Sequence, residues 1–466
     1  MRKLQLNFNN MLYIAYIILF FVMFLSFFYG DILVTSELGS NLWDFVFAGK
    51  LRLFYENNVI ECGGTKFGSL YNILVYLFFA VWTLPLKLLS IIESVDFTAY
   101  SYMSNNVFCL IWIKIFIVLS TVYVLKLLKD IVSYDNKTSN RWKYILGVFS
   151  TSILCLASTM IMTRYDMLCN IFMLLELRSY IRNEDKKFVL WAAIAFCFNY
   201  FSVLIFIPLI FLRIKNIKSI INNFIYFIIP FLITKLPFWG HPLNKAINEG
   251  NLTRNLFYML FSKEHGVFSV FAVGYLLLLL FCFCIDIHSR DDKLQIYSWI
   301  CTTAFFLLFG FCFCYPYWPI LLLPFSSLLI GLSNKNYDII NLIVETVSMA
   351  GLVLGNMLIY HWCFFGTVCS YNTLWRFLLS SNDGSYVKVM HYINILNANN
   401  VGYILCHSVF IAGMISILII NFPFKNWQIC EYEFFSFKDA NYRKAQVFRY
   451  VCTFGVCLLP LLGLVR

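Results

Sequence analysis

The sequence predicts an all-α fold: a polytopic transmembrane helical bundle of about thirteen spans, forming a single domain over residues 1–466. Two observations support this class. Hydrophobic residues make up 61% of the chain and charged residues only 13%, and mean hydropathy is +0.76. A helix needs about 20 apolar residues to cross a bilayer, and runs of this kind recur from residue 11 onward. Most of the chain is therefore expected to lie in lipid.

The formal charge of +11 does not indicate a nucleic-acid partner. Lys and Arg are scattered through short connecting segments, which favours membrane lipids and their anionic headgroups as partners. The 16 cysteines lie mostly inside apolar runs, without the spacing of a zinc site. The sequence thus predicts no metal ligands, although the need for a divalent cation stays open.

The first predicted helix covers residues 11–29. It is too long for the apolar region of a signal peptide, and no small-residue cleavage site follows it. Residues 30–106 form one long external segment, with an amphipathic helix expected near 41–56. The apolar stretch 70–91 is expected to be interfacial or re-entrant, because it contains Pro85 and Lys87. A second external segment is predicted at residues 364–400.

The distribution of positive charge predicts an N-terminus on the inside. Segments assigned to the inner side hold about two thirds of the Lys and Arg residues, as cytoplasmic loops do. These segments lie near residues 1–10, 126–143, 178–187, 213–218, 287–294, 334–337 and 422–449. The bias holds only if 70–91 does not cross the membrane, because a crossing there would invert every later segment.

Residues 188–212 form an apolar stretch with cations on both flanks, so both flanks are expected inside. Two half-depth helices, broken near residues 199–202, satisfy this condition if the turn is buried in protein or lines a cavity. The predicted spans are approximately 11–29, 107–127, 144–162, 167–181, 188–200, 202–212, 222–238, 267–285, 296–313, 317–333, 339–363, 401–421 and 447–465.

Asp31 and Asp44 are the predicted catalytic residues. Asp31 lies two residues past the first apolar run, where an acid meets lipid on one side and water on the other. Such a position suits a general base, although an ordinary helix-end acid in solvent is the alternative. Asp44 shares the predicted amphipathic helix with Trp43 and Phe47, and the solvated face of that helix would also account for it.

The segment "MTRYDM" at 162–167 joins two apolar runs through a very short external turn. This turn contains Arg164, Tyr165 and Asp166 instead of the small residues that usually connect membrane helices. We expect a polar cluster in an outer cavity, where the planar fork of Arg164 can bind a phosphate. A self-satisfied Arg–Asp pair at the interface is the alternative.

Three further cationic or titratable residues are predicted to bind substrate or phosphate. Lys114 lies roughly 10 Å below the outer end of its helix, and Lys235 lies one turn before Trp239. Ionisable groups at such depths line cavities or pair with charge, although snorkelling toward headgroups is the alternative for both. His241 lies in the external segment 239–266. "CYPYWP" at 314–319 forms an aromatic turn suited to stacking on a sugar.

Several stretches together resemble a known family. A long acidic segment beginning at Asp31, "GDILVTSELGSNLWDFVFAGKLRLFY", is followed by "YNILVYLFFAVWTLPLKLL" and "WIK". "TRYDMLCNIFMLLELRSYIRNEDKKFVLWAAIAFCFNYFSVLIFIPLIFL" and "YPYWPILLLPF" come later. Over about the first 330 residues these stretches resemble the GT-C superfamily of integral-membrane glycosyltransferases, in particular its bacterial, mannosyltransferase-like members. The chain has Thr163–Arg164 where Gly–Gln is typical, and Asn199 where a Lys is common.

The resemblance implies a multi-pass glycosyltransferase of the bacterial plasma membrane. Such enzymes move a sugar from a polyprenyl-phosphate carrier to a glycan or lipid-linked acceptor on the outer face, with an acid of the first loop, here Asp31, as the base. Two other classes stay open: a transporter or flippase of lipid-linked saccharides, and a polysaccharide polymerase. No internal repeat of the kind found in transporters is evident.

Overall fold

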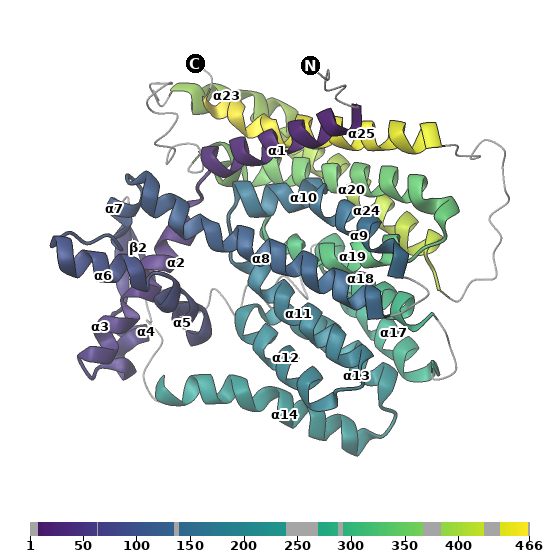
Figure 1. Ribbon diagram of the computed structural model, residues 1–466, viewed down its shortest axis with the longest axis horizontal. Helices are drawn as coiled ribbons and strands as arrows, with labels where there is room; N and C mark the ends of the chain where they lie inside the picture. Colours follow the sequence, from purple (N-terminus) through teal and green to yellow (C-terminus); the bar gives the residue numbers. More distant parts are fainter. Residues whose placement is uncertain are drawn as a thin grey trace, which may run out of the picture.

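A computed structural model describes residues 8–62, 64–134, 139–238, 269–287, 292–366, 384–423 and 439–464. Over these residues the protein is all-α apart from one small β-hairpin. Helices α2 to α7 form a group at the left end of the molecule, and α8 runs from this group toward the opposite end (Figure 1). The remaining helices pack side by side as a bundle, so the predicted all-α class is confirmed.

The helices and strands follow one another along the chain as listed here. The first group comprises α1 (Phe8–Ser26), α2 (Gly30–Ser40), α3 (Leu42–Phe47), α4 (Phe54–Asn57), β1 (Val59–Cys62), β2 (Thr65–Gly68), α5 (Ile73–Trp82), α6 (Leu84–Glu93), α7 (Tyr100–Met103) and α8 (Val107–Tyr134). The second comprises α9 (Trp142–Ser150), α10 (Ile153–Leu156), the π-helix η3 (Ala157–Ile161), α11 (Asp166–Ile181), α12 (Asp185–Phe198), η4 (Tyr200–Ser202), α13 (Val203–Arg213) and α14 (Ile217–Lys235). The third comprises α17 (Val270–Cys284), α18 (Lys293–Phe311), η7 (Trp318–Leu321), α19 (Leu323–Gly331), α20 (Asp338–Ile359), α23 (Gly384–Leu396), α24 (Val401–Ile420) and α25 (Asp439–Leu458). Short 3-10 turns are η1 (Leu51–Leu53), η2 (Ser139–Arg141), η5 (Leu236–Phe238), η8 (Lys335–Tyr337), η10 (Ala398–Asn400) and η12 (Leu459–Leu464), and η9 (Trp362–Gly366) is a second π-helix.

In the described part of the chain, five helices are long and apolar enough to cross a membrane, and up to eight spans result if each bent pair counts as one. The bent pairs break at residues 27–29, at Thr83 and at residues 151–152, with bends of 60°, 53° and 54°. Over the described residues, each predicted span overlaps at least one helix, but several of these helices are short or bent. A membrane protein with several apolar helices is therefore what the structure supports.

The segment 30–106, which was expected to be external, differs in its local structure from the prediction. A helix, α2, begins at Gly30, so Asp31 lies in the first turn of a helix instead of in a loop. The single helix expected near 41–56 is wrong: α3 ends at Phe47, and Gly49 adopts a positive φ of 65° that stops the helix. Next comes the antiparallel hairpin β1–β2, which pairs Val59 with Gly68 and was not predicted.

Helices α2 and α5 pack closely because α2 has a glycine at the contact. A Cβ at Gly39 would lie 2.4 Å from the Cβ of Phe79. Asn58 reinforces this group by donating hydrogen bonds to the carbonyl of Leu38 and the hydroxyl of Ser69, each at 2.9 Å. Helix α2, which contains Asp31, is thus fixed against α5.

The predicted break in the apolar stretch 188–212 is confirmed. Helix α12 ends at Phe198, and Asn199 adopts an extended conformation whose side chain accepts a hydrogen bond from the Phe201 N–H at 3.0 Å. Arg213, the last residue of α13, pairs with Asp185, the first residue of α12, at 2.9 Å. Helices α12 and α13 therefore form a hairpin in which the start of α12 and the end of α13 lie together.

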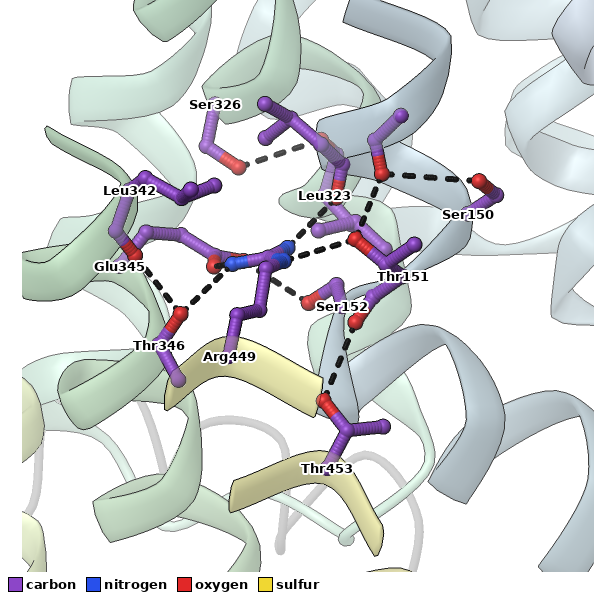
Figure 2. Close-up of polar contacts among 12 residues, drawn as sticks. Ser150, Thr151, Ser152, Leu323, Ser326, Leu342, Glu345, Thr346, Arg449 and Thr453 are labelled. Atoms are coloured by element: carbon purple, nitrogen blue, oxygen red, sulfur yellow. Dashed lines mark hydrogen bonds and ion pairs between the residues drawn. The ribbon is translucent and has the colours of Figure 1, made fainter. Parts of the chain in front are cut away.

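A buried ion pair stabilises the bend between α9 and α10 (Figure 2). Arg449 of α25 pairs with Glu345 of α20, and both side chains are almost fully buried. Arg449 also donates hydrogen bonds to the Thr151 hydroxyl and the Val148 carbonyl, each at 2.7 Å. Ser152 donates to Glu345 at 2.8 Å. Because a break frees backbone groups within the bundle, these contacts hold α9 and α10 in their bent arrangement.

Candidate functional site

The chain breaks between α1 and α2, and this break positions Asp31. Lys114 of α8 stabilises the break. The Lys114 ammonium donates hydrogen bonds to the carbonyls of Phe24, Phe27 and Met160 at 2.7, 2.6 and 2.8 Å. The side chain is only 1% exposed. A helix end leaves carbonyl groups without intrahelical partners, and a cation there also complements the helix dipole. Lys114 therefore caps α1 and joins it to η3.

This geometry corrects the assignment of Lys114 as a phosphate ligand. An ammonium has three N–H groups, and the carbonyls of Phe24, Phe27 and Met160 already occupy three donor directions. Lys114 does not line the cavity described below. The physical reason is that a buried backbone break needs donors as much as a bound anion does.

Thr163 connects the same break to the turn that was singled out in the sequence. Its hydroxyl accepts a hydrogen bond from the Tyr29 N–H at 3.3 Å, immediately before α2. Thr163 itself has a positive φ of 43°, which is unfavourable for a β-branched residue. This backbone strain lies at the residue that immediately precedes Arg164. The surrounding contacts therefore hold the turn in a backbone conformation that an unconstrained chain would rarely adopt.

Arg164 lies at the centre of a charged cluster that also contains Asp31 and Asp166. It forms ion pairs with Asp31 of α2 and, at 3.5 Å, with Asp166 of α11. Its side chain is 3% exposed, whereas that of Asp31 is 26% exposed. The structure therefore brings Asp31 together with Arg164 and Asp166, which the sequence predicted as parts of one polar turn.

Three tyrosines surround the Arg164 guanidinium. Its central carbon lies 4.2 Å from the ring centroid of Tyr317, 4.8 Å from that of Tyr165 and 5.3 Å from that of Tyr71. Arg164 also donates a hydrogen bond to the Tyr71 hydroxyl at 2.9 Å. Guanidinium groups interact favourably with aromatic faces, so these rings fix the orientation of the charge.

Asp166 is the first residue of α11 and is buried. It accepts a hydrogen bond from the Asn199 amide at 2.8 Å, and its other oxygen faces Arg164. Burial raises the pKa of the Asp166 carboxyl above its ordinary value, while Arg164 and Asn199 act in the opposite direction. Because both carboxylate oxygens accept hydrogen bonds, the contacts match the ionised form, which is acceptor-only.

A cavity of about 230 Å³ opens beside this cluster. Eight of its lining residues are aromatic, and Arg164 and Asp166 are the charged ones. The lining consists of Leu70, Tyr71, Asn72, Arg164, Tyr165, Asp166, Cys197, Phe198, Asn199, Tyr200, Phe201, Tyr315, Tyr317 and Trp318. Apolar and aromatic walls with a few convergent polar groups are typical of small-molecule sites.

The other predicted site residues lie at different places. Asp44 pairs with Lys87 at 2.8 Å, its side chain is 57% exposed, and neither residue lines the cavity. Lys235 lies in the last turn of α14, with its ammonium over the rings of Tyr55 and Phe231. The residue before it, Thr234, accepts a hydrogen bond from the cavity residue Asn72 at 2.8 Å, so Lys235 lies near the cavity. His241 lies outside the described residues.

Sequence reasoning missed the parts played by Tyr71 and Asn199. Tyr71 precedes α5 and had no charge or motif to single it out. Asn199 was placed at the predicted break near 199–202 and noted as a departure from the family pattern, but its hydrogen bond to Asp166 was not expected. Tyr317 and Trp318 belong to the aromatic turn that was expected to stack on a sugar, and both line the cavity.

Among the residues that the structure describes, no group of three or more His, Cys, Asp or Glu residues could hold a metal ion. Comparisons of the chain with protein-family models, with curated proteins and with solved structures found no match. The functional proposal therefore depends on the geometry of this site and on the sequence resemblance.

Replacing Lys114 with Met is expected to destabilise the protein by about 2–4 kcal/mol, because buried carbonyls lose their partner, and to lower the Tm by several degrees. Thermal unfolding of the purified protein measures this. Lys87→Met is the matched control: its partner Asp44 is exposed, and such pairs contribute about 1 kcal/mol or less. A Lys114→Met variant of unchanged Tm that loses substrate binding would instead support the phosphate role.

Proposed function

We propose that the chain is a membrane glycosyltransferase that moves a sugar from a polyprenyl-phosphate carrier to an acceptor hydroxyl on the outer face of the cell membrane. The observation that carries the proposal is the meeting of four distant segments at one aromatic cavity. Asp31, Tyr71, the turn at 163–166 and the turn at 315–318 all contribute to it or contact its lining. The sequence resemblance to GT-C enzymes assigns the base to Asp31, the acid that pairs with Arg164.

The position of the cavity favours an enzyme over a transporter. The lining comes from the start of α11, the turn between α12 and α13, and the segment before α19. These are helix ends, so the cavity lies toward one end of the bundle. Transporter sites lie near the middle of the bilayer, between repeated halves.

The thirteen-span topology is part of the proposal. It is supported by the contacts among the cationic helix ends: Arg182 lies over the ring of Tyr134 at 5.4 Å, and Arg213 pairs with Asp185. These residues end α8, α11 and α13 or begin α12. These four helix ends, which the charge distribution assigns to the cytoplasm, thus lie together.

In the proposed mechanism, an acceptor hydroxyl attacks the anomeric carbon of the donor sugar. Asp31 takes the hydroxyl proton, the bond between the anomeric carbon and the phosphate oxygen breaks, and polyprenyl phosphate leaves with the bonding electron pair. Arg164 orients Asp31 through their ion pair. Three cations were expected to bind phosphate. Lys114 donates hydrogen bonds to backbone carbonyls and Arg164 is paired with two carboxylates, whereas the contacts described for Lys235 are with the rings of Tyr55 and Phe231. We therefore assign the phosphate to Lys235.

The direct test supplies a radiolabelled polyprenyl-phosphate hexose to the purified protein in liposomes, with membrane extract as acceptor. The proposal expects label in a new product that resists mild acid, which cleaves the donor. Label that crosses the bilayer without a new glycosidic bond would favour the transporter. Growth of a repeating chain on the acceptor would favour the polymerase.

A further inference from the structure

We propose that the aromatic cavity accepts an uncharged or amino-bearing pyranose and rejects a uronic acid, because the cluster at its wall has an excess of negative charge. This inference names the sugar class for the proposed function and depends on it. It follows from the charge of the cluster, from the shape of the cavity and from the position of the nearest additional cation.

With both carboxyl groups ionised, as their ion pairs with Arg164 indicate, the cluster has a net charge of −1. Arg164 contributes one positive charge, and its two ion-pair partners, Asp31 and Asp166, contribute one negative charge each. Arg164 and Asp166 are the charged residues among those that line the cavity. The guanidinium that could attract a carboxylate is thus already paired twice.

Because the cluster is buried, its excess negative charge acts strongly on a ligand in the cavity. Arg164 and Asp166 are 4% and 1% exposed, and Tyr317 beside them is also buried. Charges are screened weakly in such surroundings. A second carboxylate in the cavity would face Asp166 without a free counter-ion, whereas an ammonium or a hydroxyl would be accommodated.

The rings provide the surface on which a pyranose can lie. Trp318 contacts Phe201 and Tyr315 in edge-to-face geometry, with centroids 4.9 and 5.1 Å apart. Aromatic side chains combine a large apolar face with polar edges, and the Tyr hydroxyls offer donors and acceptors to sugar hydroxyls. The nearby Lys235 is not one of the lining residues, so it can meet the carrier phosphate beside the cavity.

The test measures ligand binding in place of transfer. The full chain is placed in lipid nanodiscs free of glycoside detergents and titrated with octyl β-D-glucopyranoside, its 2-amino-2-deoxy analogue and octyl β-D-glucuronide. The concentration dependence of the Tm reports affinity. The glucoside and the amino analogue are expected to bind, and the glucuronide to bind at least about tenfold more weakly.

Three variants test whether the charge of Asp166 causes the discrimination. Asp166→Asn removes one negative charge and is expected to reduce the discrimination against the glucuronide to about threefold or less. Asp338→Asn is the matched control, because Asp338 also pairs with an arginine, Arg141, but does not line the cavity. Asp338→Asn should keep the full discrimination. Trp318→Leu should weaken all three ligands alike.

The inference is overturned if the glucuronide binds as tightly as the glucoside, if Asp166→Asn leaves the discrimination unchanged, or if no ligand binds. The transfer assay separates this failure from failure of the proposed function. Transfer without charge discrimination would refute only the inference. Discrimination without transfer would support the cavity assignment and refute the enzyme.

Discussion

Replacing Asp31 with Asn is expected to lower sugar transfer by a factor of about 10²–10⁴, the usual contribution of a general base. Asn has nearly the same shape but cannot take the proton of the acceptor hydroxyl. The variant should fold, because Arg164 keeps Asp166 as a counter-ion. Initial rates of label transfer from the polyprenyl-phosphate donor, compared at equal amounts of inserted protein, provide the measurement.

Asp44→Asn is the matched control for this experiment. Both acids lie between residues 30 and 106, and both pair with a cation, but Asp44 pairs with Lys87 away from the cavity. Its substitution should change the rate by about twofold or less, because an exposed ion pair contributes little. A rate in Asp31→Asn that matches the unchanged protein would exclude Asp31 as the base. A loss confined to Asp44→Asn would move the active site to the α3–α6 surface.

Local sequence signals predicted the features that depend on local chemistry. The apolar runs located the helices, and the cations on both flanks of 188–212 predicted the break near 199–202, between α12 and α13. The turn at 163–166 was recognised because it contains charged residues where a hairpin usually has small ones. In each case the determining residues are neighbours in the sequence, so their pattern was sufficient.

Features that depend on distant partners could not be predicted. The run that ends α1 continues through Phe27 and Phe28 without a breaking residue; the break is stabilised by Lys114 and Thr163, more than 80 residues away. Lys114 was read as a phosphate ligand for the same reason, since its acceptors are backbone carbonyls that the sequence does not reveal. The pairing of Asp31 with Arg164 likewise links two elements that only the folded bundle brings together.

The largest expected effect on stability comes from the Arg449–Glu345 pair. Arg449→Met should destabilise the protein by about 3–5 kcal/mol, because Glu345 would remain buried without its counter-ion. Glu345 is 0% exposed and Arg449 is 2% exposed. Thermal unfolding and the yield of folded protein after extraction measure the loss. Arg213→Met is the control, because its partner Asp185 has a 68% exposed side chain, and this change should cost about 1 kcal/mol or less.

The double variant Arg449→Met/Glu345→Met distinguishes a stabilising pair from one that costs as much as it contributes. Removing both charges leaves no buried ion, and two apolar side chains of similar length restore the packing. We expect the double variant to recover at least half of the stability lost by Arg449→Met. A double variant as unstable as the single one would mean that the hydrogen bonds of Arg449 to Val148 and Thr151, rather than the charge of Glu345, determine the stability of the α9–α10 bend.

The rate of sugar transfer by the double variant then tests whether the α9–α10 bend helps to orient the residues of the site. Helix α10 continues into η3, which ends three residues before Arg164. If the hydrogen bonds of Arg449 fix the direction of this segment, a stable double variant should keep sugar binding but lose transfer, since orientation of Asp31 through Arg164 demands more accuracy than binding does. Full transfer at normal stability would confine Arg449 and Glu345 to a structural role.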